Sequence, residues 1–399
     1  MSKVIYLDNN ATTAVAPEVL DAMMPFLGDL YGNPSSIHTF GGQVARHVER
    51  ARESLAALLG ADDPGEVIFT SCGTESDNTA VRSALACYPD RHHVVTTRVE
   101  HPAVRSLCQW LGQAMPGRTH YRVTELPVDG QGMLNLDEFA AALCDDTALV
   151  SVMWANNETG VLFPVDKIGA LCRERGVQFH TDAVQAVGKV PINLSKQPID
   201  MLSLSGHKLH APKGIGALYV RRGTRFTPYM MGGHQENNRR GGTESVPLIV
   251  GLGKAAELAK KNLGQEQTRI RALRDRLEED LLAKAPGARL NGHPDHRLPN
   301  TTNISFEYVE GEAILLMLDQ HGICASSGSA CTTGSLEPSH VLRAMGVPFT
   351  AAHGSIRFSL SIYNTQDDID TVVRVLPPII RRLREISPFG REHLAAAKR

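Results

Sequence analysis

Residues 177–220 read VQFHTDAVQAVGKVPINLSKQPIDMLSLSGHKLHAPKGIGALYV. Turn-forming residues separate three short apolar runs in this stretch, at residues 177–181, 201–205 and 216–220. Apolar runs of this length between turn residues are typical of buried strands. The first run leads into Asp182, and the second leads into Ser205-Gly206-His207-Lys208. We therefore expect a sheet whose strands end in polar side chains.

The same pattern continues toward the N-terminus. Further candidate strands lie at residues 67–71, 94–97, 121–126 and 148–154. Amphipathic segments with helical spacing lie between several of the strands, at residues 76–87, 103–113, 136–143 and 165–175. Alternation of strands and helices favours a mostly parallel sheet with helices on both faces. The sequence thus predicts an α/β protein with a mostly parallel seven-stranded sheet in its large domain.

The C-terminal third follows a different pattern. Residues 251–285 are rich in Ala, Leu, Glu, Lys and Arg, which predicts one or two long helices leaving the large domain. Candidate strands at 301–307 and 355–360 and a helix at 368–386 indicate a smaller α+β domain. We expect a large domain at 16–255 and a small domain formed by 1–15 and 256–399, with a mobile loop at 324–336. The segment before Pro17 is expected to pack near the active site or on the small domain.

Composition limits the class of protein. The chain has 399 residues, of which 42% are hydrophobic, which suffices for a sizeable core and suggests two domains. The formal charge of −2 and the lack of a long basic run argue against nucleic acid or an anionic membrane as the main partner. Neither a signal peptide nor an apolar membrane span is recognisable. We expect a soluble, cytoplasmic protein.

Seven cysteines are scattered along the chain. They are Cys72, Cys87, Cys108, Cys144, Cys172, Cys324 and Cys331. Their number is odd and no CxxC pair occurs, so a disulfide framework or structural zinc site is not expected. Cys331 lies in the small-residue run 324–335, which predicts an exposed, mobile thiol suited to nucleophilic chemistry. The alternative is an incidental loop thiol, whereas Cys324 follows an apolar, strand-like residue and is interpreted as structural.

Residues 70–76, Thr-Ser-Cys-Gly-Thr-Glu-Ser, join a strand to a helix. The free N–H groups of such a helix start form an anion site. The alternative is an ordinary helix cap made by Thr74 or Ser76. Neither a P-loop nor a dinucleotide-binding fingerprint occurs in the chain.

Two further motifs lie at strand ends. Asp182 follows an apolar strand and is suited to pair with a protonated ring nitrogen, although a helix cap is an equal alternative on spacing alone. Lys208 follows the next strand, where partial desolvation lowers the pKa of a lysine and frees its amine for a Schiff base. Ser205 and His207 beside it are suited to hold a phosphate. A helix-start anion site, a strand-end Asp and a strand-end Lys, in this order, meet the needs of a pyridoxal-phosphate site.

With these motifs the sequence closely resembles the cysteine desulfurases, which are class V, fold-type I pyridoxal-phosphate enzymes. The resemblance extends over essentially the whole chain. It is carried by residues 6–13 (YLDNNATT), 154–160 (WANNETG), 326–332 (SSGSACT) and 336–340 (LEPSH). The segment around Cys331 resembles the group with the long cysteine loop, and the amino-acid sequences of the motifs are most similar to the nitrogen-fixation (NifS-like) type.

The resemblance implies a role for each site residue. Lys208 is implied to hold the cofactor, Cys331 to accept sulfur, and His101 to stack on the cofactor ring and move protons. The other cofactor-binding residues implied are Gly73, Thr74, Asn157, Asp182, Gln185, Ser205, His207 and Thr243. Thr243 is expected to reach the phosphate of a neighbouring subunit, although Ser245 departs from the usual residue in that loop. Substrate binding is implied for Asn33, Asn157 and Arg357, the last as a fork for the substrate carboxylate.

The resemblance also implies the reaction and its partners. L-cysteine is expected to become L-alanine, with its sulfur held as a persulfide on Cys331 and passed to a scaffold protein for iron–sulfur cluster assembly. A homodimer, a link to nitrogenase maturation, and transient contact of Cys331 with a nascent [2Fe-2S] cluster are expected as well. An aminotransferase or a selenocysteine lyase would use Lys208 equally without needing Cys331, and a binding scaffold is a third alternative.

Overall fold

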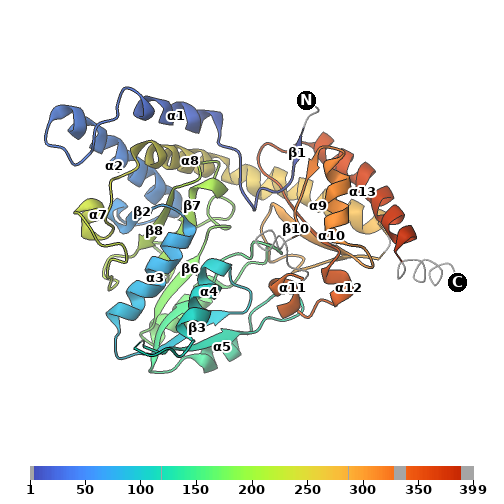
Figure 1. The fold of residues 1–399 in the computed structure, drawn as a ribbon, viewed down its shortest axis with the longest axis horizontal. Helices are drawn as coiled ribbons and strands as arrows, with labels where there is room; N and C mark the ends of the chain where they lie inside the picture. The colour runs from blue at the N-terminus through green and yellow to red at the C-terminus, as the bar shows by residue number, and fades with distance from the viewer. Residues whose placement is uncertain (1–3, 118, 286, 328–337, 388–399) are drawn as a thin grey trace.

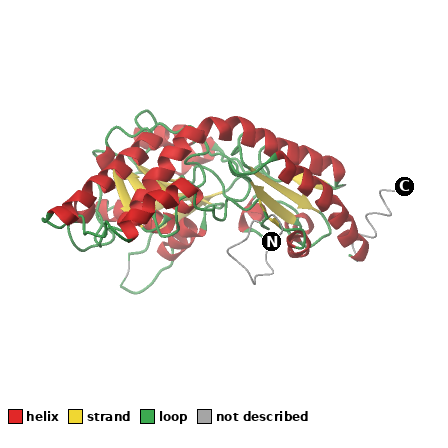
Figure 2. Ribbon diagram, turned by 90° about the horizontal axis from the view of Figure 1, so that it is seen from above, coloured by secondary structure: helices red, strands yellow, loops and turns green. Residues whose placement is uncertain are grey.

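A computed structural model describes residues 4–117, 119–285, 287–327 and 338–387. Figure 1 shows two parts side by side, a larger one formed mainly by the first two thirds of the chain and a smaller one formed mainly by the last third. A long helical rod runs along both parts, and the N-terminal segment crosses from the smaller part to the larger. The view from above in Figure 2 shows the same elongated arrangement.

The larger part contains a seven-stranded sheet with the strand order β2-β8-β7-β6-β5-β3-β4. The strands are β2 (Val67–Thr70), β3 (His93–Thr97), β4 (Arg122–Leu126), β5 (Thr147–Ser151), β6 (Gln178–Asp182), β7 (Met201–Ser205) and β8 (Gly216–Val220). Only β8 runs antiparallel to its neighbours in this sheet. The predicted fold class and the mostly parallel seven-stranded sheet are therefore confirmed.

Successive side chains along the strands enter two different cores. Ile68, Val94 and Leu149 pack in a core with α3 (Gly73–Cys87) and α4 (Pro102–Leu111). The residues that follow them, among them Phe69, Val95 and Val150, pack in the main core on the opposite face. That core also includes α1 (Pro17–Leu27), α2 (Thr39–Leu59) and α6 (Val165–Glu174). Because both faces are covered, these strands carry apolar side chains on both faces of the sheet.

The rod consists of α8 (Val246–Gln265), a π-helical turn (Glu266–Ile270) and α9 (Arg271–Lys284) without a break. It begins five residues before the predicted start at 251, because Pro247 occupies the first turn, where its missing N–H costs nothing. The rod packs tightly on α2, and a Cβ on Gly253 would lie 2.5 Å from the Cα of Ala51. The close approach requires glycine at this position.

The smaller part contains two short sheets. Strands β9 (Ala288–Leu290), β10 (Thr301–Phe306) and β12 (Ser355–Ser359) form an antiparallel sheet, and β1 (Ile5–Tyr6) pairs in parallel with β11 (Ile323–Cys324). Helices α9, α10 (Gly311–Asp319) and α13 (Gln366–Ile386) contribute to its separate core. The remaining helices are α5 (Leu136–Ala142), α7 (Gln235–Asn238), α11 (His340–Ala344) and α12 (Phe349–Ala352).

The predicted domain limits remain a prediction. Ile5 and Leu7 pack in the core of the smaller part, whereas residues of α11 and α12 pack with the core of the larger part. Of the predicted mobile loop, residues 324–327 are described: Cys324 ends β11, and Ser326 pairs with Arg357 of β12. The rest of this loop lies outside the described residues. Within the described ranges, no helix combines the length and apolar character that crossing a membrane requires.

Candidate active site

A cavity of about 430 Å³ lies at the carboxyl ends of β6 and β7. Ten of the thirteen residues that the sequence singled out line it, although they come from distant segments. These are Gly73, Thr74, His101, Asn157, Asp182, Gln185, Ser205, His207, Lys208 and Arg357. Parallel strands bring their carboxyl ends to one edge of a sheet, which is why motifs that follow separate strands meet here.

Lys208 ends a short 3₁₀ turn (Gly206–Lys208) directly after β7. Its Nζ donates hydrogen bonds to the carbonyl oxygens of Asn10 at 2.5 Å and Ala11 at 2.7 Å. Burial, together with the nearby charges of Arg357 and Lys189, lowers the pKa of Lys208 to about 7. A substantial fraction of the amine, about half at a pH equal to this pKa, is therefore in its neutral, nucleophilic form near neutral pH.

The start of α3 provides an anion site at one end of the cavity. The helix begins at Gly73, so Thr74 and Ser76 lie within it, and the N-cap residue Cys72 makes no side-chain cap hydrogen bond. The alternative of a cap by Thr74 or Ser76 is therefore wrong. A Cβ on Gly73 would lie 2.9 Å from Val184 Cγ2, so only glycine lets the helix start approach the β6 loop this closely. The uncapped N–H groups and the helix dipole favour a phosphate.

His207 also faces the cavity at the start of the turn that carries Lys208. Its Nδ1 lies 3.2 Å from the hydroxyl of Thr12, and burial lowers the pKa of His207 to about 4. The imidazole is therefore neutral at neutral pH. With Nδ1 engaged by Thr12, Nε2 remains to bind a phosphate oxygen.

Asp182 ends β6 and is 6% exposed. Its Oδ1 accepts a hydrogen bond of 2.9 Å from the N–H of Val184. Burial raises the pKa of Asp182, while the charges of His101 and Lys208 oppose that rise. Beside it, Gln185 donates from Nε2 to the carbonyl of Asn10 at 3.0 Å, and its buried Oε1 has no hydrogen-bond partner. The site thus holds a carboxylate suited to a ring N–H, together with an unused acceptor.

His101 is both a helix cap and a cavity residue. It is the N-cap of α4, and its Nδ1 accepts from the N–H of Ala103 at 3.2 Å. Burial lowers the pKa of His101, as does the charge of Lys208, whereas Asp182 raises it. A structural and a chemical role are compatible at this position, because the capping contact engages Nδ1 and leaves Nε2 free of it.

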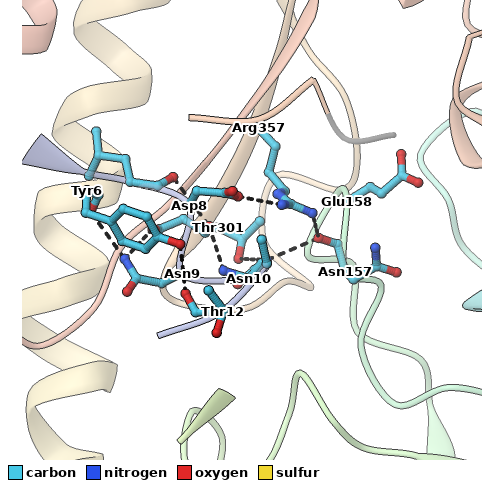
Figure 3. Close-up of polar contacts among 12 residues, drawn as sticks. Tyr6, Asp8, Asn9, Asn10, Thr12, Asn157, Glu158, Thr301 and Arg357 are labelled. Carbon is cyan, nitrogen blue, oxygen red and sulfur yellow. Dashed lines mark hydrogen bonds and ion pairs between the residues drawn. The ribbon is translucent and has the colours of Figure 1, made fainter. Parts of the chain in front are cut away.

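Arg357 lies on β12 and brings the smaller part of the molecule to the cavity (Figure 3). Its Nη2 pairs with Asp8 Oδ1 at 2.7 Å, and its Nη1 donates to the carbonyl of Asn157 at 3.0 Å. The same carbonyl accepts from Asn10 Nδ2 at 3.2 Å. The guanidinium is 2% exposed, and its Nε has no hydrogen-bond partner. A fixed, buried guanidinium of this kind is suited to bind a small carboxylate.

Sequence reasoning missed four contributors. Asn10 and Ala11 receive the amine of Lys208, Asp8 holds Arg357, and Asp77 of α3 lines the cavity. The expectation that the N-terminal segment packs near the active site or on the small domain is confirmed on both counts. The only signal for Asp8, Asn10 and Ala11 was the motif at 6–13, to which no role had been given, and Asp77 had no such signal.

Three predicted site residues do not line this cavity. Asn33 is exposed, and its Oδ1 accepts from the N–H of Ser35 at 2.9 Å, which is the turn that its Gly-Asn-Pro setting favours. Thr243 is also exposed and lines a separate hollow of about 140 Å³ with Ser71 and Arg240. Cys331 lies outside the described residues. Their predicted roles stay predictions, and no group of three or more potential metal ligands occurs among the described residues.

The chain is similar in sequence to a known family and to named enzymes within it. The model of the family described as aminotransferase class-V matches residues 5–372. The chain is 61% identical to a cysteine desulfurase of Trichormus azollae, over 97% of this chain and 95% of that protein. It is 59% identical to the cysteine desulfurase NifS of Azotobacter vinelandii, over 96% and 94%.

Solved structures agree with the sequence relatives. The structure of a NifS-like protein superposes with a TM-score of 0.88 at 37% identity, covering 96% of this chain and all of the other. The structure of SspA in complex with cysteine superposes with a TM-score of 0.79 at 35% identity, covering 90% of this chain and 99% of the other.

Proposed function

We propose that the residues of this cavity carry out the steps of a cysteine desulfurase reaction, because this chain belongs to the aminotransferase class-V family. The chain is a pyridoxal-phosphate-dependent cysteine desulfurase with L-cysteine as its substrate. The observation that carries the assignment of roles is the convergence of Lys208, Asp182 and Arg357 on one cavity.

The residues present fit pyridoxal phosphate. The uncapped start of α3, with Ser205 and His207, would hold its phosphate, and Asp182 would face the ring nitrogen. Lys208 would hold the cofactor covalently, since its lowered pKa of about 7 leaves a substantial fraction of the amine neutral near pH 7. When bound, the cofactor supplies an electron sink for bond cleavage at the carbons of an amino acid.

The remaining groups would bind the substrate and move protons. Arg357 would bind the carboxylate of L-cysteine, because its fork is fixed by Asp8 and by the carbonyl of Asn157. Lys208, once released from the cofactor, would take a proton from the substrate Cα. His101, which faces the cavity with a lowered pKa, would move protons near the substrate sulfur.

Cys331 would take the sulfur. Its thiolate would attack the substrate sulfur, so that an S–S bond forms on the enzyme as the C–S bond of L-cysteine breaks. L-cysteine and the thiol of Cys331 thus give L-alanine and a persulfide, with no other oxidant or reductant needed. The small-residue composition around Cys331 supports this role, because such a segment exposes a thiol rather than burying it.

We further propose partners for the chain. A homodimer would place the exposed Thr243 at a neighbouring subunit's site, which would account for its position away from the cavity of its own chain. An iron–sulfur scaffold protein would accept the sulfur, with Cys331 briefly contacting the [2Fe-2S] cluster, and nitrogenase maturation would be one use. The six described cysteines are unpaired, which suits a cytoplasmic location.

Replacing Cys331 by Ala tests the assignment. The variant is expected to keep the visible absorption band of the bound cofactor but to lose sulfide release from L-cysteine in the presence of a thiol reductant. Cys324→Ala is the matched control, because Cys324 ends β11 and is half-buried. That control should release sulfide at the wild-type rate. Sulfide release by Cys331→Ala at a rate near the wild type would refute the role of Cys331.

A further inference from the structure

Asp77 is a second carboxylate at the cavity for which the proposed function has no use. It lies on α3, one turn after the anion site at the helix start, and is 1% exposed. It lines the same cavity as Asp182, and its Oδ1 has no hydrogen-bond partner. A buried carboxylate oxygen without a partner is costly, so its charge state needs an explanation.

The nearest imidazole does not neutralise Asp77. His180 Nε2 lies 3.6 Å from Asp77 Oδ1, but it also contacts Ser203 Oγ at 2.9 Å, while Nδ1 contacts Ser151 Oγ at 2.9 Å. Burial lowers the pKa of His180 to about 3, so the ring is neutral at physiological pH. Its two hydroxyl partners satisfy the ring without a charge.

The other ionisable groups that face Asp77 raise its pKa. Burial contributes most, followed by the charge of Asp182, and Glu100 and Cys72 act in the same direction. Only the hydrogen bond from Ser203 opposes them. The basic groups His101 and Lys208 act on Asp182 instead, since both lower the pKa of that residue. The two aspartates therefore differ in their surroundings, and Asp182 is the better placed of the two to carry a charge.

We propose that Asp77 remains protonated in the working enzyme, so that Asp182 alone carries the negative charge that faces the cofactor ring. Two buried carboxylates that share a site cannot both ionise without compensating cations, and the ring nitrogen offers one positive charge. Asp77 is thus a positioning residue that acts through Asp182. An ionised Asp77 would compete with Asp182 for the ring proton and would raise the pKa of the bound cofactor.

The inference rests on the proposed function for its cofactor part, but the charge state of Asp77 can be measured without the cofactor. Infrared spectra of the cofactor-free protein near pH 7.5 are expected to show a protonated-carboxyl absorption that Asp77→Asn removes. Glu100 and Glu158, whose pKa values burial raises to about 8 and about 7, absorb in both proteins and cancel in the difference spectrum. A difference spectrum without this band would overturn the proposal even if the enzyme is a desulfurase.

The second measurement is the pH titration of the visible band of the loaded enzyme. Asp77→Asn resembles the protonated acid in shape and charge, so the titration midpoint and the cofactor affinity should stay close to the wild type. Removing an ionised neighbour would instead shift the midpoint by roughly one to three pH units. Such a shift in Asp77→Asn would overturn the proposal. Asp77→Leu should weaken cofactor binding, because it removes the polar contact with Ser203. Equal behaviour of the Asn and Leu variants would overturn the positioning role of Asp77.

Discussion

Buried ionisable groups form ion pairs in one region of the molecule and lack them in another. Between α2 and α7, Arg52 Nη1 lies 2.7 Å from Glu236 Oε2 and Nη2 lies 3.0 Å from Oε1, and both side chains are at least 95% buried. Glu236 also accepts from the N–H of Phe69. At the cavity, Lys208 has only carbonyl partners and Asp77 Oδ1 has none.

The difference separates structural charges from chemical ones. A bidentate pair with satisfied hydrogen bonds keeps both groups ionised, and breaking it leaves a buried charge. A buried amine without a counter-charge loses its proton more easily, which costs stability and provides reactivity. Removing a charge should therefore have opposite consequences for stability in the two regions.

Replacing Lys208 by Met should have the largest effect and would test this contrast directly. Loss of the amine is expected to reduce desulfurase activity by roughly 10²–10⁴-fold, as for other proton-transfer groups, and to abolish covalent retention of the cofactor. The free energy of unfolding of the cofactor-free protein should not decrease, because a buried amine without an ion-pair partner is replaced by an apolar chain. Activity is measured as alanine formation, and stability by urea unfolding. A clear loss of stability would contradict the contrast.

Replacing Glu236 by Gln should have the opposite effect. Arg52 would then carry an uncompensated buried charge, and the free energy of unfolding should fall by about 3–5 kcal/mol. The visible band of the bound cofactor should keep its position, since Glu236 does not line the main cavity. Adding Arg52→Met to this variant should restore part of the stability. A loss below about 1 kcal/mol, typical of exposed ion pairs, would show that the pair is not structurally important.

The same contrast explains what the sequence could predict. Lys208 and Asp182 follow apolar strands, so their strand-end positions were recognisable from local pattern. Asp77 lies in a local setting that looks ordinary, and Asp8 lies in a motif without an assigned role, so only the folded chain shows that one lines the cavity and the other holds Arg357. The pair Arg52–Glu236 spans 184 residues, and no local pattern reports it. Charge state depends on such distant neighbours. The sequence therefore predicted which groups could react, but it did not predict how the fold shifts their pKa values.

The smallest effect should be on the pH dependence of cofactor capture by the cofactor-free protein. Only the neutral amine of Lys208 attacks the cofactor aldehyde, and burial lowers its pKa from the ordinary 10.5 to about 7. The capture rate should therefore rise tenfold per pH unit below pH 7 and level off above it. Lys189 is a matched probe, because its charge contributes to this lowering without lining the main cavity. Lys189→Met should move the midpoint to higher pH by less than about one unit, since desolvation rather than Lys189 dominates the shift. A rate that still rises steeply between pH 8 and pH 10 would mean that Lys208 behaves like the amine of an exposed lysine.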